Sequence, residues 1–148
     1  MLKYLVSMKY FLILLLISVG SITEKRASKT LNKHYGEEIV LLKTKTQVPN
    51  GTLYEVTGKT DKVYIGYSPS KFDNFDFMVL LDNTNKVKLV KVLIYRENYG
   101  GEIGSKRWLK QFIGMTEPKS YVDAISGATI SVNSMKYSIN KLIKSLSE

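Results

Sequence analysis

The residues of this chain that are best suited to chemistry stand together near its carboxyl end, in the segment Asp123-Ala124-Ile125-Ser126-Gly127-Ala128-Thr129. This segment leads directly into a helix that the apolar spacing predicts from about Ser131. The first turn of a helix presents unpaired backbone N–H groups and a partial positive charge, and small residues let an anion approach that backbone closely. Hydroxyl groups at Ser126, Thr129 and Ser131 add hydrogen-bond donors or a point of covalent attachment. The segment is therefore a candidate phosphate site.

A simpler interpretation of the same segment is a helix cap. Serine and threonine are preferred at the start of a helix, where their hydroxyl oxygens accept hydrogen bonds from first-turn N–H groups. Ser131 or Thr129 would make that contact here. Residue types alone favour the cap and leave phosphate binding open.

The pattern Asp-x-x-Ser/Thr-Gly-Ala-Thr resembles the attachment motif of the bacterial FMN-binding domain family, and all seven positions match. That family includes the C subunit of the sodium-translocating NADH:quinone reductase, the G subunit of the ferredoxin-oxidising Rnf-type complex, and many small exported proteins. In the family, a separate, magnesium-dependent flavin transferase joins the last threonine of the motif to FMN through a phosphoester. The resemblance implies that FMN is the cofactor and that Thr129 carries it. It also implies that the transferase recognises the preceding residues, which shape the turn: Asp123, Ser126, Gly127 and Ala128.

A second segment supports the resemblance, which covers approximately residues 60–146. Before the motif, family members commonly have a charged, glycine-bearing loop and then a helix with an aromatic-Gln-Phe ending, here Trp108-Leu109-Lys110-Gln111-Phe112. The widespread form of the loop is Glu-Thr-Pro-Gly-x-Gly, whereas this chain has Asn98-Tyr99 and no proline. The resemblance implies that five residues of the loop lie near the flavin ring: Glu97, Tyr99, Gly100, Gly101 and Gly104.

Two residues near these segments have alternative interpretations. Trp108 could stack on the flavin ring, but its alignment with Leu109 and Phe112 on one helical face favours the core. Arg96 could neutralise the flavin or its phosphate, or it could pair with an acidic residue on the surface.

The rest of the sequence predicts the elements that position these residues. Helical spacing predicts a short helix that ends at Gly36, a helix that opens at Ser105 and ends at Gly114, and the final helix. β-Branched and aromatic runs predict strands, and the clearest pair is a hairpin with a possible bulge between Lys88 and Lys91. We therefore expect one α+β domain with a twisted antiparallel sheet and flanking helices. The predicted short helix covers residues 27–35, and the predicted strands cover residues 37–45, 53–56, 63–67, 75–81 and 87–95.

The amino-terminal residues have the pattern of an export signal. Lys3 and Lys9 precede an apolar run that ends at Gly20 and Ser21, and the following residues are polar. The unbroken run is about ten residues long, whereas a membrane-spanning helix needs about 20. We expect a cleaved signal peptide, or alternatively a membrane anchor, in residues 1–21. An N-terminal helix and first strands would follow in residues 22–60, and the FMN-binding domain in residues 61–148.

Composition excludes several classes of site. The chain of 148 residues has no cysteine, so it cannot form a disulfide, a thiolate metal site or an iron–sulfur cluster. One histidine is too few for a histidine metal site. The formal net charge is +9, but the lysines are scattered along the chain, as on solvated faces, so nucleic-acid binding is not predicted.

Together these features predict an exported, FMN-carrying protein, periplasmic or on the outer face of the cytoplasmic membrane, that transfers electrons and has no catalytic residues of its own. Its expected partners are the flavin transferase and membrane or extracytoplasmic redox proteins. An exported flavin-dependent reductase with non-covalent FMN is the main alternative. A flavin-free structural module is a third.

Overall fold

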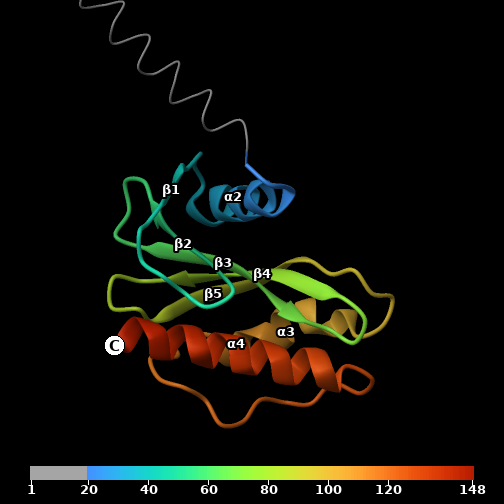
Figure 1. Cartoon of the computed structure of the whole chain (residues 1–148). Coiled ribbons are helices and arrows are strands. Elements are labelled where there is room, and N and C mark those ends of the chain that lie inside the picture. The colour runs from blue at the N-terminus through green and yellow to red at the C-terminus, as the bar shows by residue number, and fades with distance from the viewer. Residues whose placement is uncertain (1–19) are drawn as a thin grey trace, which may run out of the picture.

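The computed structural model describes residues 20–148, which form an antiparallel sheet with helices on both faces (Figure 1). The predicted α+β fold is confirmed. The predicted signal or anchor lies outside the described residues, except for Gly20 and Ser21. Among residues 20–148, no helix has both the length and the hydropathy needed to cross a bilayer. The helical elements are α2 (Ile22–Tyr35), η1 (Gly101–Gly104), α3 (Lys106–Leu109), η2 (Lys110–Phe112) and α4 (Thr129–Ser147).

The sheet follows the order of the chain, because every strand pairs with the next one. In the β4–β5 hairpin, Leu80 pairs with Leu89 but Leu81 pairs with Val87, so Lys88 is the extra residue of a bulge. This confirms the predicted hairpin and shows that its bulge lies at Lys88, at the edge of the predicted stretch, because the pair Leu89 and Val90 is in regular register. The strands are β1 (Leu41–Lys43), β2 (Gly51–Val56), β3 (Lys62–Pro69), β4 (Asn74–Leu81) and β5 (Val87–Ile94).

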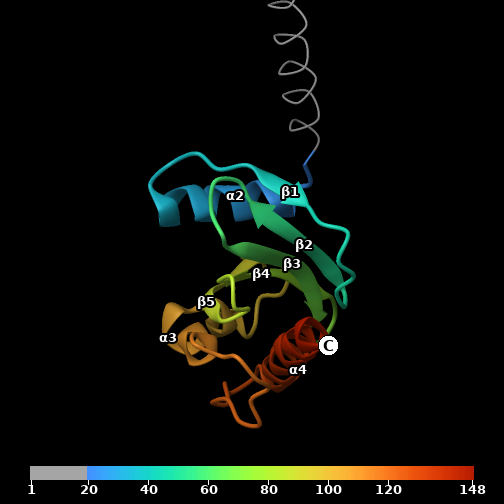
Figure 2. The ribbon, with the colours of Figure 1, turned by 90° about the vertical axis from the view of Figure 1, so that its left-hand side faces the viewer.

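Each face of the sheet carries its own core, because successive side chains of a strand point to opposite faces. In β4, Phe77 and Val79 pack toward α3 and α4, whereas Met78 and Leu80 pack toward α2. Figure 2 shows the resulting layers, with α2 on one side of the sheet and α3 and α4 on the other. The sheet thus separates the start of the described chain from the helix that follows the motif.

Helix α2 begins earlier than predicted. Ser21 and Glu24 form a capping box, in which each side chain accepts a hydrogen bond from the backbone N–H of the other. The polar first turn obscured this start, which was expected at residue 27. Gly36 ends the helix in the left-handed conformation, as predicted, with φ of 72°. The strand expected over residues 37–45 is reduced to β1, Leu41–Lys43.

The other helices differ from expectation mainly at their ends. Ser105 caps α3 as predicted, but the helix is only four residues long and continues as the 3-10 turn η2. Helix α4 begins at Thr129 instead of near Ser131. The predicted apolar stripe of α4 is buried at Val132, Met135, Ile139, Leu142 and Ile143.

Candidate functional site

Thr129 is the first residue of α4, and its side chain is exposed. The preceding residue, Ala128, is the N-cap and has no side chain that could accept a hydrogen bond. The first helical hydrogen bond is donated by the N–H of Val132 to the carbonyl of Ala128 at 2.9 Å. Thr129, Ile130 and Ser131 therefore come before any N–H group with a helical acceptor. The cap interpretation of Thr129 and Ser131 is wrong, because α4 starts before Ser131 and no side chain caps it.

The turn before Thr129 has a conformation that requires glycine. The N–H of Ala128 donates to the carbonyl of Ile125 at 3.1 Å, which closes the turn. Gly127 lies inside it with φ of 78°, a backbone conformation that side chains disfavour. Ser126 and Gly127 are exposed, whereas Ala128 is buried. The turn therefore brings the hydroxyl of Thr129 to the surface at the positive end of α4.

Trp108 and Gln111 fix the other end of the motif by holding the backbone of Asp123. The indole Nε1 of Trp108 donates to the Asp123 carbonyl at 2.7 Å, and Gln111 Oε1 accepts from the Asp123 N–H at 2.8 Å. Trp108 is buried and packs edge-on against Phe112, with ring centroids 5.3 Å apart. This confirms the core interpretation of Trp108. The side chain of Asp123 is left free to face solvent.

The glycine-rich loop packs directly against the motif at Gly100. A Cβ atom built on Gly100 would lie 2.8 Å from the Cβ of Ala128 and 2.9 Å from Tyr95 Oη. Gly100 also has φ of 77°. Tyr95 Oη lies 3.1 Å from the buried Oγ of Ser131, which attaches the loop to α4. The structure thus brings Gly100 and Ala128 together, and only glycine fits at this contact.

The family model of the FMN-binding domain matches residues 72–144. These residues belong to the FMN-binding domain family. The matched range contains both the motif and the glycine-rich loop, which the structure places in contact. No curated protein matches the chain closely enough to count as a relative. FMN is therefore the cofactor of this domain, and the protein is an FMN-binding flavoprotein.

The start of α4 in the FMN-binding domain fits the phosphate of FMN. A phosphate is an anion, and a helix start without a side-chain cap offers it N–H donors and positive charge. The close approach of Gly100 to Ala128 leaves no side chain between the loop and the motif backbone. The exposed hydroxyl of Thr129 lies at the same place.

The other predicted residues of the glycine-rich loop do not contact the motif as Gly100 does. The Glu97 carboxylate accepts hydrogen bonds from the N–H groups of Lys71 at 3.3 Å and Phe72 at 2.6 Å. Glu97 therefore holds the loop between β3 and β4. The side chain of Tyr99 is 81% exposed. Gly101 and Gly104 lie in η1, where a Cβ atom would make no close contact.

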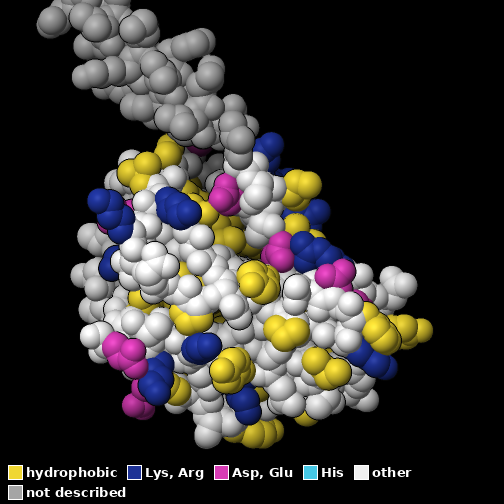
Figure 3. Space-filling view, viewed as in Figure 1, with side chains coloured by type: hydrophobic (Ala, Val, Ile, Leu, Met, Phe, Trp, Pro, Cys, Tyr) yellow, Lys and Arg dark blue, Asp and Glu magenta, His cyan; other side chains and the backbone are white. Residues whose placement is uncertain are grey.

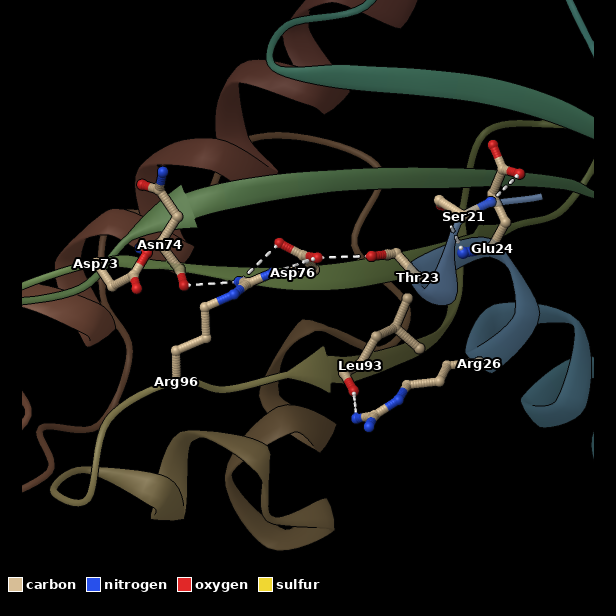
Figure 4. A network of polar contacts seen from close by, with 9 residues as sticks. All are labelled: Ser21, Thr23, Glu24, Arg26, Asp73, Asn74, Asp76, Leu93 and Arg96. Carbon is tan, nitrogen blue, oxygen red and sulfur yellow. Dashed lines mark hydrogen bonds and ion pairs between the residues drawn. The ribbon is translucent and has the colours of Figure 1, made fainter. Parts of the chain in front are cut away.

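Arg96 is engaged in an ion pair beside the glycine-rich loop (Figure 4). Its guanidinium donates two hydrogen bonds to the Asp76 carboxylate, at 3.1 and 3.0 Å, and one to the carbonyl of Asn74 at 2.9 Å. Thr23 of α2 donates to the same carboxylate at 2.6 Å. The acid-pairing interpretation of Arg96 is therefore the one that the structure supports.

The charges of this ion pair reinforce each other. Burial alone would raise the pKa of Asp76, but the hydrogen bonds from Arg96 and Thr23 outweigh it and hold that pKa below its usual range. The hydrogen bond to Asp76 raises the pKa of Arg96. Both groups are therefore charged at neutral pH, and the Arg96 guanidinium is paired with the Asp76 carboxylate.

Sequence reasoning missed Tyr95 as a neighbour of this site. Tyr95 looked like the end of a strand, and nothing in the sequence indicated that its hydroxyl reaches Ser131. Two open hollows in the described surface lie elsewhere, one beside Tyr137 and Lys141 of α4 and the other beside Thr23 and Asp76.

Proposed function

We propose that this flavoprotein is an exported electron carrier whose FMN is bonded covalently to Thr129. One observation carries the proposal: Thr129 is exposed at the uncapped start of α4, in a complete attachment motif within an FMN-binding domain. An exposed hydroxyl is accessible to a second protein after folding. A separate flavin transferase would then act on the folded chain.

The attachment is a phosphoryl-group transfer. The hydroxyl oxygen of Thr129 forms a bond to the phosphorus of an FMN group supplied as a phosphoanhydride. The bond from that phosphorus to its leaving phosphate breaks, and the hydroxyl proton goes to a base of the transferase. No electrons are exchanged in this step. The uncapped N–H groups of α4 stabilise the negative charge that remains on the phosphodiester.

The turn and its supports prepare Thr129 for this reaction. The hydrogen bonds of Trp108 and Gln111 to Asp123 anchor the start of the motif, and the left-handed Gly127 closes its end. The motif is thus held at both ends. The Thr129 hydroxyl at the start of α4 stays exposed, so a transferase could reach it. The exposed side chains of Asp123 and Ser126 are available for recognition by the transferase.

Electron transfer outside the cytoplasm is the use that best suits this arrangement. FMN supplies one- and two-electron redox chemistry when bound, and the protein contributes its position and surroundings. A covalent link prevents loss of the cofactor from an exported protein. The proposal of export depends on the signal pattern of residues 1–21, and it predicts redox partners in the periplasm or on the outer face of the cytoplasmic membrane.

Intact mass tests the attachment. The chain is co-expressed with a flavin transferase, and we expect its mass to increase by one FMN less one water. Thr129→Ala should show no increase, because the acceptor oxygen is gone. Thr116→Ala, which removes an exposed threonine outside the motif, should gain the same mass as the wild type. An unmodified wild type, or equal modification of Thr129→Ala, would refute the proposal. FMN that is released on denaturation would favour the non-covalent reductase.

Cell fractionation tests the export. The full-length chain should be recovered outside the cytoplasm or with the membrane, whereas a variant lacking residues 2–19 should stay in the cytoplasm. Equal cytoplasmic recovery of both chains would contradict this part of the proposal and leave the attachment result unaffected.

A further inference from the structure

Helix α2 presents a row of lysines on its outer side. Lys25, Lys29 and Lys33 are exposed and follow one another at intervals of four residues, so they lie on one side of the helix. The buried residues Ala27 and Leu31 stand two positions after the first two lysines, about 200° around the helix axis. The lysine row therefore points away from the sheet. Figure 3 shows Lys and Arg side chains at the end of the molecule that carries α2.

The charge of the lysine row is not neutralised within the described part of the chain. None of its three lysines belongs to an ion pair among residues 20–148. The one acidic residue of α2, Glu24, is directed to the sheet, where it accepts a hydrogen bond from Tyr54 Oη at 2.6 Å. The outer side of α2 is thus positively charged along its length.

The other charged residues near α2 have partners of their own or lie beyond its end. Arg26 is held against the sheet, because its guanidinium donates to the carbonyl of Leu93 at 2.7 Å (Figure 4). Glu37 and Glu38 follow the end of the helix at Gly36, and Glu37 is paired with Lys59. These groups therefore do not shield the lysine row.

The lysine row begins where the described chain begins. Ile22 stands three residues before Lys25, on the same side of α2, and is 68% exposed. The apolar run of residues 10–19, which we expect to be a signal or anchor, comes directly before this part of the chain. Helix α2 is therefore the element of the fold that follows the apolar run most closely.

We propose that the outer side of α2, formed by Ile22 and the lysine row, lies on the anionic phospholipid headgroups of the membrane. Phosphodiester headgroups carry the opposite charge, and each lysine close to such a surface strengthens the attraction. An acidic protein is the other partner that a basic row can bind. The exposed Ile22 and the adjoining apolar run favour a bilayer instead. The inference goes beyond the proposed electron transfer and requires no FMN.

This contact gives the domain a defined orientation on the membrane. The sheet lies between α2 and α4, so the start of α4 is on the side of the domain away from the lysine row (Figure 2). A domain that rests on α2 therefore turns Thr129 toward the aqueous phase. A flavin transferase and a redox partner would both approach from that phase.

Vesicle binding of the full-length chain without FMN tests the contact. Vesicles of phosphatidylcholine alone are compared with vesicles of equal parts phosphatidylcholine and phosphatidylglycerol, and bound protein is measured by co-sedimentation. The triple variant Lys25→Gln, Lys29→Gln, Lys33→Gln should bind the anionic vesicles about 100-fold more weakly than wild type, since each lysine contributes about fivefold. Both chains should bind phosphatidylcholine equally, because residues 1–21 are the same in both.

A second triple variant separates the lysine row from net charge. Lys110→Gln, Lys141→Gln and Lys144→Gln remove the same charge from exposed positions of η2 and α4, on the other side of the sheet. This variant should bind anionic vesicles as wild type does. Equal weakening by both triple variants would mean that net charge alone attracts the protein to lipid, and the proposal would be overturned.

A label at the far end of α2 decides the case in which residues 1–21 hold every variant on the vesicles. The chain has no cysteine, so Lys33→Cys and Tyr137→Cys each create a single labelling site. On anionic vesicles, lipids with a nitroxide headgroup should quench a fluorophore at position 33. They should not quench one at position 137, which is 64% exposed on α4. No quenching at position 33, or equal quenching at both positions, would overturn the lipid contact and leave an acidic protein as the partner of the lysine row.

Discussion

Gly100 is the residue through which the glycine-rich loop meets the motif. Two independent constraints act on it, the left-handed backbone and the absence of space for a Cβ atom against Ala128. The neighbouring Gly101 has neither constraint, because nothing lies within 4 Å of a Cβ built there and its φ is not positive. The two glycines look equivalent in the sequence, and the structure distinguishes them.

Gly100→Ala should therefore destabilise the protein by about 1–3 kcal/mol, since the added methyl group overlaps Ala128 and strains the backbone. Gly101→Ala should change the stability by less than about 0.5 kcal/mol. Urea unfolding at neutral pH measures both. If the two variants unfold at the same urea concentration, the contact between loop and motif is not the constraint described here.

At the scale of residues, the sequence predicted what lies in one continuous segment. Thr129 and its turn could be found because seven consecutive residues form the motif. Tyr95 could not, since its relation to the site depends on the contact of its hydroxyl with Ser131, 36 residues away. The uncapped helix start was also hidden, because serine and threonine near a helix start usually indicate a cap.

Among the elements, helix α2 contributes hydrogen bonds to the sheet although few of its residues are buried. Only Ala27 and Leu31 of this helix are buried, yet Thr23 bonds to Asp76 and Arg26 donates to the carbonyl of Leu93 at 2.7 Å. Helix α2 precedes the range matched by the FMN-binding family. It nevertheless supports β4 and β5, from which the loops at the site depart.

Thr23→Val should remove the hydrogen bond to Asp76 while keeping the shape of the side chain. We expect a loss of about 1 kcal/mol in the free energy of unfolding. Thr30→Val is the matched control, because the Thr30 hydroxyl donates only to the carbonyl of Arg26 within the same helix. A loss no greater in Thr23→Val than in Thr30→Val, measured by urea unfolding, would show that α2 is not held by Asp76.

The elements that the sequence predicted well are those with strong periodicity. The β4–β5 hairpin and the apolar stripe of α4 were confirmed. In both, the apolar residues of the repeating pattern are the buried ones, so the sequence carries a strong signal. The start of α2 and the extent of β1 were wrong. A polar first turn carries no periodic signal, and a three-residue edge strand has too little length to show one.

For the molecule as a whole, acid stability should depend on buried and bonded carboxylates. Burial alone would raise the pKa of Asp61, but hydrogen bonds from Lys88 and Tyr35 hold it below its usual value. The same direction holds for Asp76. A carboxyl group with a lower pKa when folded stabilises the protein above its unfolded pKa of about 3.9, and this contribution is lost as pH falls through the folded pKa.

Asp61→Asn should therefore cost about 2 kcal/mol at neutral pH, because a charged hydrogen-bond partner of Lys88 is lost. The difference from wild type should shrink as the pH falls below about 4. Urea unfolding at several pH values measures it, with the exposed Glu117→Gln as control. A difference that stays constant from neutral to acid pH would mean that the Asp61 charge contributes nothing.

The chain-order sheet has a consequence for how the protein folds. Each strand pairs with the strand that precedes it in the sequence. The connecting loops are therefore short, and closing them costs little conformational entropy. Helix α4 is different, since its Ser138 meets Ser68 across 70 residues of chain. We expect docking of this last helix to limit the rate of folding. Thr129, its first residue, would then reach its final place only in that slow step, so the hydroxyl that we propose as the FMN acceptor would be in position only once the fold is complete.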